Sequence, residues 1–291
     1  MVTPKEPLRV ALSVLVYIVL YGAAQIVLYP VLGVAGEIPG ATLTVLLGAI
    51  FANWLSLRIY ENRTLPDAGL RWSRASAENL GLGLAGGIGA ACLVLAPPLV
   101  AGAAHVVSTT DHPGAGTMPF VMALLAMGAA GEELLFRGYG FQVLLANFGP
   151  WATIAPVGVI FAAMHAANPN ATWFGLANTA GFGILFGYAF LRTRDLWLPI
   201  GLHFGWNVTL PLFGASLSGL TMNVTGHQMV WTAGKLWSGG DYGPEASLLT
   251  SGVLILLFLY LWKAPLRRQR SPLTDPPAEV IPCAPWPSQQ S

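Results

Sequence analysis

Three charged residues stand close together in an otherwise apolar part of the sequence. Glu132, Glu133 and Arg137 lie within the stretch AAGEELLFRGYGF. Glu133 and Arg137 are four residues apart, so on a helix they share one face and can form an ion pair. Glu132 is rotated by roughly 100° from Glu133 and has no such local partner. Either Glu132 is a protonated structural residue, or it contacts water or a partner on another helix. A carboxylate at membrane depth is by default a candidate functional residue.

Two histidines and an asparagine follow in later apolar segments. His165 ends the run FAAMH, and His203 begins the run HFGWN. Asn207 lies four residues after His203 and therefore on the same face of a helix. A single histidine in an apolar helix is often a satisfied core residue. Two histidines, an asparagine at helical spacing and an unpaired glutamate together form a set that can do chemistry.

The residue types in this set are compatible with two chemistries. A glutamate with a histidine can hold and deprotonate a water, which is the role of a general base. A histidine with an asparagine can donate hydrogen bonds to a developing oxyanion. Together these roles describe hydrolysis of an amide inside a membrane cavity. Alternatively, Glu132, His165 and His203 could bind a divalent metal, because two imidazoles and one carboxylate are a known zinc ligand set.

The composition indicates the surroundings in which these residues act. Of the 291 residues, 54% are hydrophobic and only 9% are charged, whereas soluble domains carry about 25% charged residues. So few charges cannot cover the surface of a soluble globule, so most of the outer surface must face the lipid bilayer. The net charge of +1 gives no support to binding of nucleic acid.

Apolar runs of the length needed to cross a bilayer, roughly 20 residues, recur along the chain. We predict an all-α, polytopic membrane protein with about eight transmembrane helices. Residues 1–262 form a single transmembrane domain with the motif core at 117–213, and residues 263–291 form a disordered cytoplasmic tail. The predicted spans are Val10–Leu28, Ile38–Leu57, Leu80–Ala104, a span starting near Met118, Trp151–Ala167, Trp173–Leu191, Leu196–Phe213 and Ser247–Trp262.

The distribution of positive charge supports this count and gives an orientation. With eight spans, twelve basic residues fall on the side of both termini and only Lys235 falls on the other. Positive residues favour the cytoplasmic side, so we predict an integral, multi-pass membrane protein with both termini cytoplasmic. If the host is bacterial, this membrane is the plasma membrane. The twelve are Lys5, Arg9, Arg58, Arg63, Arg71, Arg74, Arg192, Arg194, Lys263, Arg267, Arg268 and Arg270.

The depths of the polar residues require one unusual helix. Counted at 1.5 Å per residue from Met118, Glu132 lies roughly 21 Å below the outer surface. His203 agrees with this depth, but His165 does so only if the fifth span begins below the membrane. We therefore predict that the fourth helix continues to about Asn147 and projects from the bilayer. If the fourth helix stopped near Gly138, the depth of His165 would no longer be expected to match that of Glu132 and His203.

At these residues the chain resembles the CPBP family, the CAAX proteases and bacteriocin-processing enzymes, also called the ABI family. The three family motifs stand here in order, each on its own span, between Thr117 and Phe213. They are E-E-x-x-x-R at Glu132–Arg137, F-x-x-x-H at Phe161–His165 and H-x-x-x-N at His203–Asn207.

The resemblance implies a role for each motif residue. Glu132 is the base that activates water, helped by His165, while His203 and Asn207 form the oxyanion hole. Glu133 and Arg137 hold the geometry of the site. The resemblance further implies a membrane-associated peptide or protein substrate, of which CAAX proteins are one example, that is cut at the cytosolic face. The family has been described both as metalloproteases and as glutamate-dependent proteases, and we favour a mechanism without a cofactor, because an asparagine beside His203 suits an oxyanion better than a metal.

Two other classes of function use similar residues. Buried Glu, Arg and His also occur in proton-coupled transporters, although the internal repeat that often marks carriers is not evident here. In a non-catalytic scaffold or immunity-type protein, the polar cluster would only tie helices together, and changing Glu132 would abolish no activity.

Overall fold

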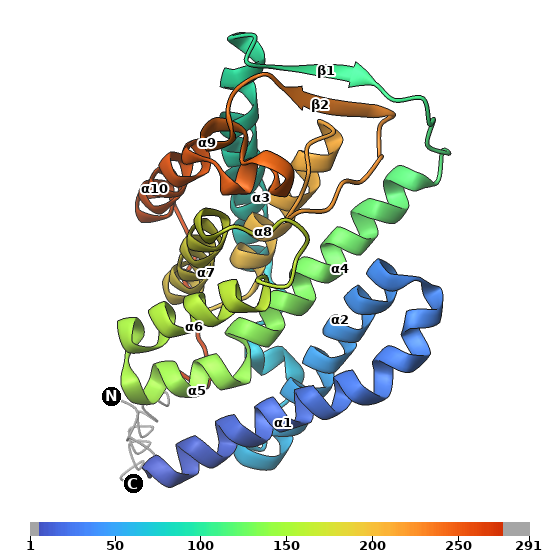
Figure 1. Cartoon of the computed structure of the whole chain (residues 1–291). Coiled ribbons are helices and arrows are strands. Elements are labelled where there is room, and N and C mark those ends of the chain that lie inside the picture. The colour runs from blue at the N-terminus through green and yellow to red at the C-terminus, as the bar shows by residue number, and fades with distance from the viewer. Residues whose placement is uncertain (1–5, 276–291) are drawn as a thin grey trace, which may run out of the picture.

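The computed structural model describes residues 6–275, and this part of the chain is built almost entirely from helices (Figure 1). Each of the eight predicted segments forms a helix, as expected for an all-α membrane protein. The helices are α1 (Pro7–Leu32), α2 (Glu37–Ser56), α3 (Arg74–Val100), α4 (Thr117–Arg137), α5 (Tyr139–Phe148), α6 (Pro150–Met164), α7 (Trp173–Thr193), α8 (Trp197–Leu212), α9 (Lys235–Ser238) and α10 (Leu248–Lys263). Short 3-10 or π turns lie at Gly33–Ala35, Leu57–Glu61, Leu65–Ala68, Gly240–Tyr242 and Pro244–Ala246. One antiparallel pair of strands, β1 (Ala104–Ser108) and β2 (His227–Trp231), was not predicted.

Within residues 6–275, five helical stretches are long and apolar enough to cross a membrane. They are Pro7–Ala35, Glu37–Glu61, Arg74–Val100, Thr117–Phe148 and Trp173–Thr193. Two shorter apolar helices, α6 and α10, lie beside them. The chain is therefore an all-α polytopic membrane protein.

The helix ends gather at two opposite ends of the molecule. We call one the strand end, because β1 and β2 lie there with the starts of α2, α4 and α7 (Figure 1). The other is the basic end, where α1, α3 and α8 start and where eleven of the twelve predicted cytoplasmic basic residues lie; the twelfth, Lys5, is outside the described residues. Lys235 of α9 lies at the strand end.

Two apolar cores flank α4. The first is formed mainly by α3, α7, α8 and α10, and α4 contributes Leu125 to it. The second is formed mainly by α1, α2 and α5, and α4 contributes Leu134. Helix α4, which carries Glu132 and Glu133, is therefore fixed from both sides.

Helices α3 and α8 pack with almost no separation between their backbones. A Cβ atom on Gly87 would overlap the Leu202 carbonyl oxygen and lie 2.8 Å from the Trp206 amide nitrogen. On α8, a Cβ on Gly201 would lie 2.6 Å from the Leu80 carbonyl oxygen. Small residues allow such close approach between membrane helices, and here they set the position of α8, the helix with the H-x-x-x-N motif.

We expect Gly87→Ala to displace α8, since a methyl group has no room against the α8 backbone. Overpacking of this kind costs about 1–3 kcal/mol, so the melting temperature in detergent and any activity should both fall. Gly89→Ala is the matched control on the same helix, because a Cβ there meets nothing within 4 Å. Equal melting temperatures for the two variants would contradict this packing.

The prediction of one continuous fourth helix to Asn147 is wrong. Helix α4 ends at Arg137, Gly138 has ψ −144°, and α5 starts at Tyr139 in a new direction (Figure 1). The cause is Asn53 of α2, whose Nδ2 donates to the Leu134 carbonyl at 3.0 Å and whose Oδ1 accepts from the Tyr139 amide at 2.7 Å. A Cβ on Gly138 would collide with that Asn53 side chain.

Removing the Asn53 amide should destabilise this break strongly. Asn53→Leu leaves the buried Tyr139 amide without its partner, at a cost of about 1–3 kcal/mol, and removes one of the two side-chain hydrogen bonds that the Leu134 carbonyl accepts. Ser56→Ala is the control on α2, because the buried Ser56 hydroxyl has no hydrogen-bond partner among the described residues. Thermal unfolding in detergent should separate the two variants clearly, and a stable Asn53→Leu protein would show that the break does not depend on this amide.

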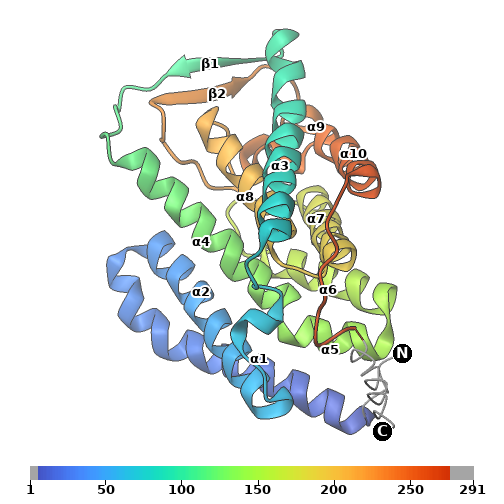
Figure 2. The same cartoon turned by 180° about the vertical axis from the view of Figure 1, so that it is seen from behind.

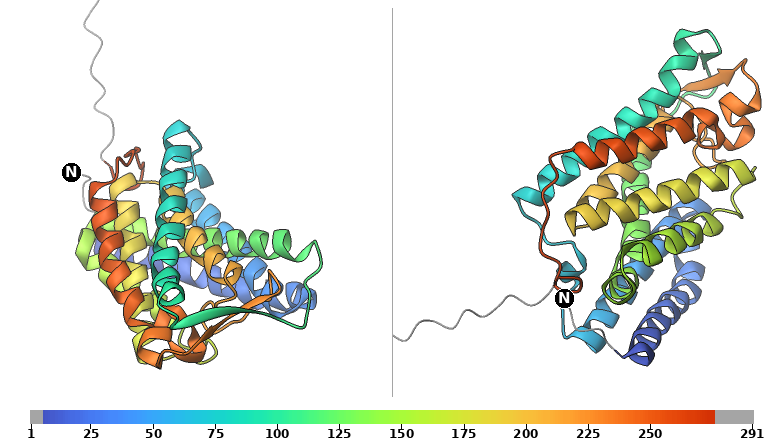
Figure 3. Two further views of the ribbon diagram at one scale, coloured as in Figure 1. Left: turned by 90° about the horizontal axis from the view of Figure 1, so that it is seen from above. Right: turned by 90° about the vertical axis from the view of Figure 1, so that its left-hand side faces the viewer.

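The prediction of a disordered tail after Lys263 is also wrong for residues 264–275, while 276–291 lie outside the described residues. This segment runs from α10 along the basic end towards α5 (Figures 2 and 3). The Arg267 amide donates to Asn79 Oδ1 at 2.9 Å, and Ser271 Oγ donates to Gln142 Oε1 at 3.2 Å. A polar composition indicated disorder, but the buried polar groups at the ends of α3 and α5 supply partners for it.

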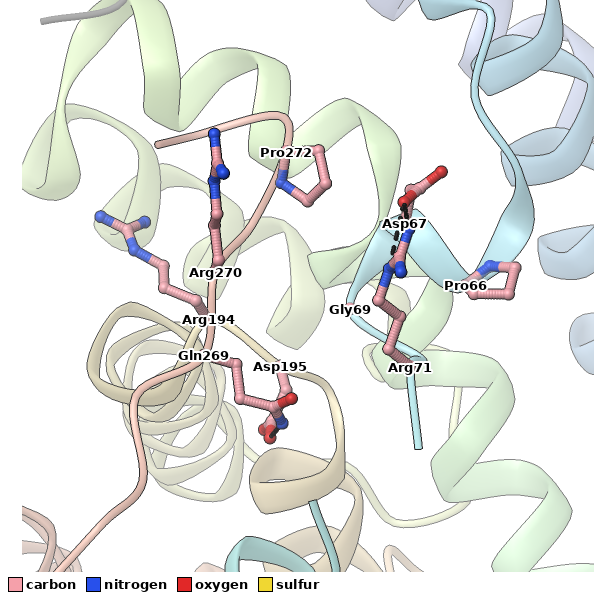
Figure 4. A pocket seen from close by; sticks show the side chains of 9 residues that line it. All are labelled: Pro66, Asp67, Gly69, Arg71, Arg194, Asp195, Gln269, Arg270 and Pro272. Atoms are coloured by element: carbon pink, nitrogen blue, oxygen red, sulfur yellow. Dashed lines mark hydrogen bonds and ion pairs between the residues drawn. The ribbon is translucent and has the colours of Figure 1, made fainter. Parts of the chain in front are cut away.

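Asp195, in the loop between α7 and α8, is the main anchor of this segment. Its carboxylate accepts hydrogen bonds from Gln269 and, at 2.8 Å, from Asn79. Burial raises the pKa of the Asp195 carboxyl, and these hydrogen bonds oppose that rise. A small pocket of about 20 Å³ separates Asp195 and Gln269 from the Asp67–Arg71 ion pair (Figure 4), which is room for about one water.

Candidate functional site

The structure brings the predicted site residues together although they come from three helices. Glu132 lies on α4, His165 immediately follows the last residue of α6, and His203 and Asn207 lie on α8. All four line one cavity of about 760 Å³. The co-location therefore holds even though the fourth helix stops at Gly138.

The turn at Gly138 explains why His165 reaches the site. Helix α5 carries the chain sideways, and α6 then returns over only 15 residues to end at Met164. At 1.5 Å per residue, α6 is about 22 Å long, which is short of a bilayer core of about 30 Å. His165 thus lies at the end of a short helix, where irregular backbone lines a cavity.

Glu133 and Arg137 form the ion pair expected from their spacing, and it is completely buried. Arg137 Nη1 lies 3.2 Å from Glu133 Oε1, and both side chains are 0% exposed. Arg137 Nη2 also donates to the Gly183 carbonyl of α7 at 2.7 Å. Glu133 Oε1 in turn contacts His203 Nδ1 at 2.9 Å. Two side chains of α4 therefore fix both α7 and α8 at the level of the site.

Aromatic rings surround the buried charges. The Arg137 guanidinium lies 5.0 Å from the Phe161 ring centre and 5.3 Å from that of Phe186. Phe186 also stacks on the His203 ring, with centroids 4.9 Å apart and an interplanar angle of 15°. Such contacts attract a cation to the face of the ring, and they restrict the His203 ring to one orientation.

Glu132 faces both histidines. Its Oε2 atom lies 3.9 Å from His165 Nε2 and 3.9 Å from His203 Nε2. This distance is too long for a direct hydrogen bond, and Glu132 Oε2 has no hydrogen-bond partner among the described residues although it is buried. One water can bridge polar groups at such a separation, so the three atoms outline a position for a single water-sized molecule.

The hydrogen bonds at the other ring nitrogens determine which protons the histidines carry. His165 Nδ1 lies 2.7 Å from the Phe161 carbonyl oxygen, which only accepts hydrogen bonds, so Nδ1 carries the proton. His165 Nε2 is then a free acceptor directed at Glu132. His203 Nδ1 similarly donates to Glu133, so its Nε2 can donate only when the ring is an imidazolium.

Asn207 stands one helical turn beyond His203 on the same cavity wall. It is half-buried, and no hydrogen bond to its side chain amide is found among the described residues. Its Nδ2 can therefore donate to a molecule in the cavity, beside His203 Nε2.

Carboxylate and imidazole groups such as those of Glu132, His165 and His203 are common zinc ligands. The distances between these groups, however, are longer than those between ligands of one zinc ion. Histidine ligands commonly donate their second ring nitrogen to a carbonyl or carboxylate, as both rings do here. Ligands of one tetrahedral zinc ion with bonds of about 2.0 Å would be roughly 3.3 Å apart, compared with 3.9 Å here. Within residues 6–275, no group of three His, Cys, Asp or Glu side chains has the geometry of a metal site. The separations therefore fit a bridging water better than a shared metal.

One buried carboxylate of the cavity wall was missed at the sequence level. Glu245 Oε1 accepts from Trp206 Nε1 at 3.1 Å, and its Oε2 accepts from the amide and hydroxyl of Ser218. Trp206 lies between His203 and Asn207 in the motif. Glu245 stands in the 3-10 turn Pro244–Ala246, and no spacing relates it to α8, so only the folded structure reveals this contact.

Comparison with known proteins agrees with the motifs. The sequence model of one family, described as type II CAAX prenyl endopeptidase Rce1-like, matches residues 114–209. No curated protein matches the chain. The matched stretch contains the motif residues from Glu132 to Asn207. Of these, Glu132, His165, His203 and Asn207 line one cavity, and the buried Glu133–Arg137 pair contacts His203 beside it. Residues 114–209 are thus similar to the type II CAAX prenyl endopeptidases, in agreement with the resemblance of the three motifs.

Proposed function

We propose that this protein is an intramembrane endopeptidase that hydrolyses a peptide bond of a membrane-associated substrate with a water activated by Glu132 and His165. The observation that carries this proposal is the unpartnered Glu132 Oε2 atom, which faces two histidine Nε2 atoms at 3.9 Å inside a cavity of about 760 Å³. A general base has to lie within reach of its water, and this geometry meets that requirement.

In the proposed reaction, one water lies between Glu132 Oε2 and His165 Nε2. It donates one hydrogen bond to each, which leaves a lone pair of its oxygen free to attack the substrate carbonyl. As the new C–O bond forms, Glu132 accepts the proton and becomes a neutral carboxylic acid. The carbonyl oxygen takes the electron pair of the broken π bond and becomes an oxyanion.

His203 and Asn207 stabilise that oxyanion in the proposed reaction. Asn207 Nδ2 and, in the imidazolium form, His203 Nε2 donate hydrogen bonds to it. Glu133 stabilises the imidazolium through its 2.9 Å contact with Nδ1. Loss of one such donor typically costs 10²–10³-fold in kcat. The intermediate then collapses, the C–N bond breaks, and Glu132 returns its proton to the leaving amine.

We propose that this reaction uses no metal, with zinc held by Glu132, His165 and His203 as the alternative. If zinc were bound, those three residues would have to approach each other, and the metal would supply Lewis acidity at the carbonyl. The 3.9 Å separations and the position of Asn207 support the first mechanism.

We also infer that eight helices, with α4 and α5 counted as one, cross the bilayer and that both chain ends face the cytoplasm. Eleven described basic residues lie at the basic end and only Lys235 at the strand end. An asymmetry of this size fits the preference of Lys and Arg for the cytoplasmic side.

The experiment is to incubate purified protein in detergent with a CAAX-type peptide and with a generic membrane peptide. Mass spectrometry of the products should show one new amine and one new carboxylate at a single bond. If a folded wild-type protein cleaves neither these nor a broader peptide library, a non-catalytic scaffold becomes the better account.

A further inference from the structure

Glu245 is a buried carboxylate of the cavity wall that has no part in the proposed reaction. It lies in the 3-10 turn Pro244–Ala246 and is 8% exposed. Among residues 6–275, its side chain accepts hydrogen bonds from the indole N–H of Trp206 and from the amide and hydroxyl of Ser218. All three donors are neutral. Burying a carboxylate without a cationic partner is costly, so packing alone does not explain why an acid stands here.

The backbone around Glu245 is fixed by two helices. Asn178 of α7 donates from its Nδ2 to the Glu245 carbonyl at 2.8 Å. Thr250, in the first turn of α10, donates its hydroxyl to the carbonyl of the preceding Pro244 at 2.7 Å. The carboxylate therefore extends from a rigid turn, and the groups that it holds keep a defined position relative to α7 and α10.

On one side, the carboxylate holds α8 at the motif itself. Trp206 stands between His203 and Asn207 and is 3% exposed. Its indole N–H donates to Glu245 Oε1 at 3.1 Å. Successive residues of a helix are joined by its backbone hydrogen bonds, so α8 cannot turn or slide at Trp206 without moving Asn207. The contact with Glu245 therefore limits where the Asn207 amide can lie in the cavity.

A row of aromatic rings also connects Trp206 with His203. The ring centroids of Trp206 and Phe182 lie 4.7 Å apart, and those of Phe182 and Phe186 lie 5.9 Å apart. Phe186 in turn stacks on the His203 ring. Because such an interior is close-packed, an indole that left its place would allow both Phe rings to move. The His203 ring would then lose the face that restricts its orientation.

On the other side, the carboxylate holds a strained residue of the cavity wall. Ser218, in the loop after α8, has φ 50°, a left-handed conformation that is uncommon for residues other than Gly. Its amide and its hydroxyl both donate to Glu245 Oε2, the hydroxyl at 2.9 Å. Strained backbone persists only where its surroundings hold it. One carboxylate thus fixes two adjoining parts of the wall, α8 and the loop that follows it.

We propose that Glu245 is a positioning residue of the peptidase site, which acts through Trp206 to hold Asn207 and His203 where the oxyanion forms. This proposal rests on the proposed peptidase function. It also explains why an acid stands at this position. Trp206 occupies one carboxylate oxygen and Ser218 the other, and both oxygens must accept, whereas the amide of a glutamine has only one acceptor oxygen.

Replacement of Glu245 by Gln tests this role in steady-state cleavage. The change keeps the size of the side chain but leaves either Trp206 or Ser218 without an acceptor. We expect kcat to fall by about 10²-fold, the effect of misplacing a catalytic group by about 1 Å. KM should stay unchanged, because the oxyanion donors act in the transition state rather than on the bound substrate. An unchanged kcat, or a loss confined to KM, would overturn the proposal.

Thr250→Val is the matched control for a purely structural role. It removes the hydroxyl that holds the same turn but leaves the contacts of the carboxylate in place. Both variants should lower the melting temperature in detergent, while only Glu245→Gln should lower kcat. An equal loss of kcat in the two variants would show that Glu245 acts only through the stability of the turn.

Trp206→Phe approaches the same contact from α8, and it remains informative if Glu245→Gln does not fold. It removes the indole N–H and should also lower kcat with an unchanged KM. The double variant should be no less active than the weaker of the two single variants, because both changes break one link. Losses of kcat that simply multiply would show that Glu245 does not act through Trp206.

A nuclear magnetic resonance measurement tests the link without any activity. In protein with isotope-labelled tryptophan, the Trp206 indole N–H signal is the one that Trp206→Phe removes. It should exchange slowly with deuterium in the wild type and in Thr250→Val, and it should shift and exchange faster in Glu245→Gln. A signal that does not respond to Glu245→Gln would refute the link. A responding signal in a wild-type protein that cleaves no peptide would refute the peptidase function instead, and with it the catalytic purpose of the link.

Discussion

Replacement of Glu132 by Gln should lower kcat for peptide cleavage by about 10³-fold, within the range of 10²–10⁴ expected for loss of a general base. Gln has nearly the same shape as Glu but cannot accept the proton of the attacking water. Because Glu132 Oε2 has no hydrogen-bond partner among the described residues, the change should not lower the melting temperature. Steady-state cleavage and thermal unfolding in the same detergent measure both quantities.

Asp241→Asn is the matched control for this substitution. It also exchanges a carboxylate for an amide, but Asp241 is exposed in a 3-10 turn at the strand end and does not line the cavity. Its activity should equal that of the wild type. Activity of Glu132→Gln above a tenth of the wild-type value would remove Glu132 from the role of base.

The second large effect is expected at the buried ion pair, this time on stability. Glu133→Gln leaves the Arg137 guanidinium buried without its counter-charge, and breaking a buried pair from one side costs about 3–5 kcal/mol. Arg137→Met should cost a similar amount, because among residues 6–275 it leaves the Glu133 carboxylate with His203 as its one hydrogen-bond partner. The double variant should recover much of this loss, since both charges are then absent. Thermal unfolding of the four proteins gives the coupling energy directly.

Activity should follow a different course in the same four proteins. The double variant should stay inactive although it is folded, because His203 Nδ1 no longer faces a carboxylate that favours its imidazolium form. Recovered activity in the double variant would show that Glu133 only stabilises the fold. Strictly additive losses of stability would show that the two side chains do not depend on each other.

The residues of the site could be predicted from the sequence, whereas the course of the backbone between α4 and α6 could not. Glu133 and Arg137 pair as their spacing required, because the geometry of one helix determines that contact. His165, His203 and Glu132 meet because charged and polar groups within a membrane have few other places to go. The break at Gly138 could not be foreseen, since Asn53, which stabilises it, lies 86 positions from Tyr139 in sequence.

Two further features depend on distant partners in the same way. Residues 264–275 have the polar composition of a flexible tail, yet Asp195 and Asn79 anchor them. Glu245 lies 39 positions from Trp206 and is joined to it only in the folded chain. Local patterns predict helices and the residues on their faces, whereas contacts across such distances require the three-dimensional structure.

Cleavage under metal-free conditions tests the central claim most directly. The wild-type protein is treated with a strong chelator, its residual metal content is measured, and cleavage is compared with that of Glu132→Gln. Water activation by Glu132 and His165 predicts that metal-free wild-type protein keeps its full activity while Glu132→Gln has almost none. Loss of activity on chelation, with recovery when Zn²⁺ is returned, would contradict this mechanism and favour a metal held by Glu132, His165 and His203.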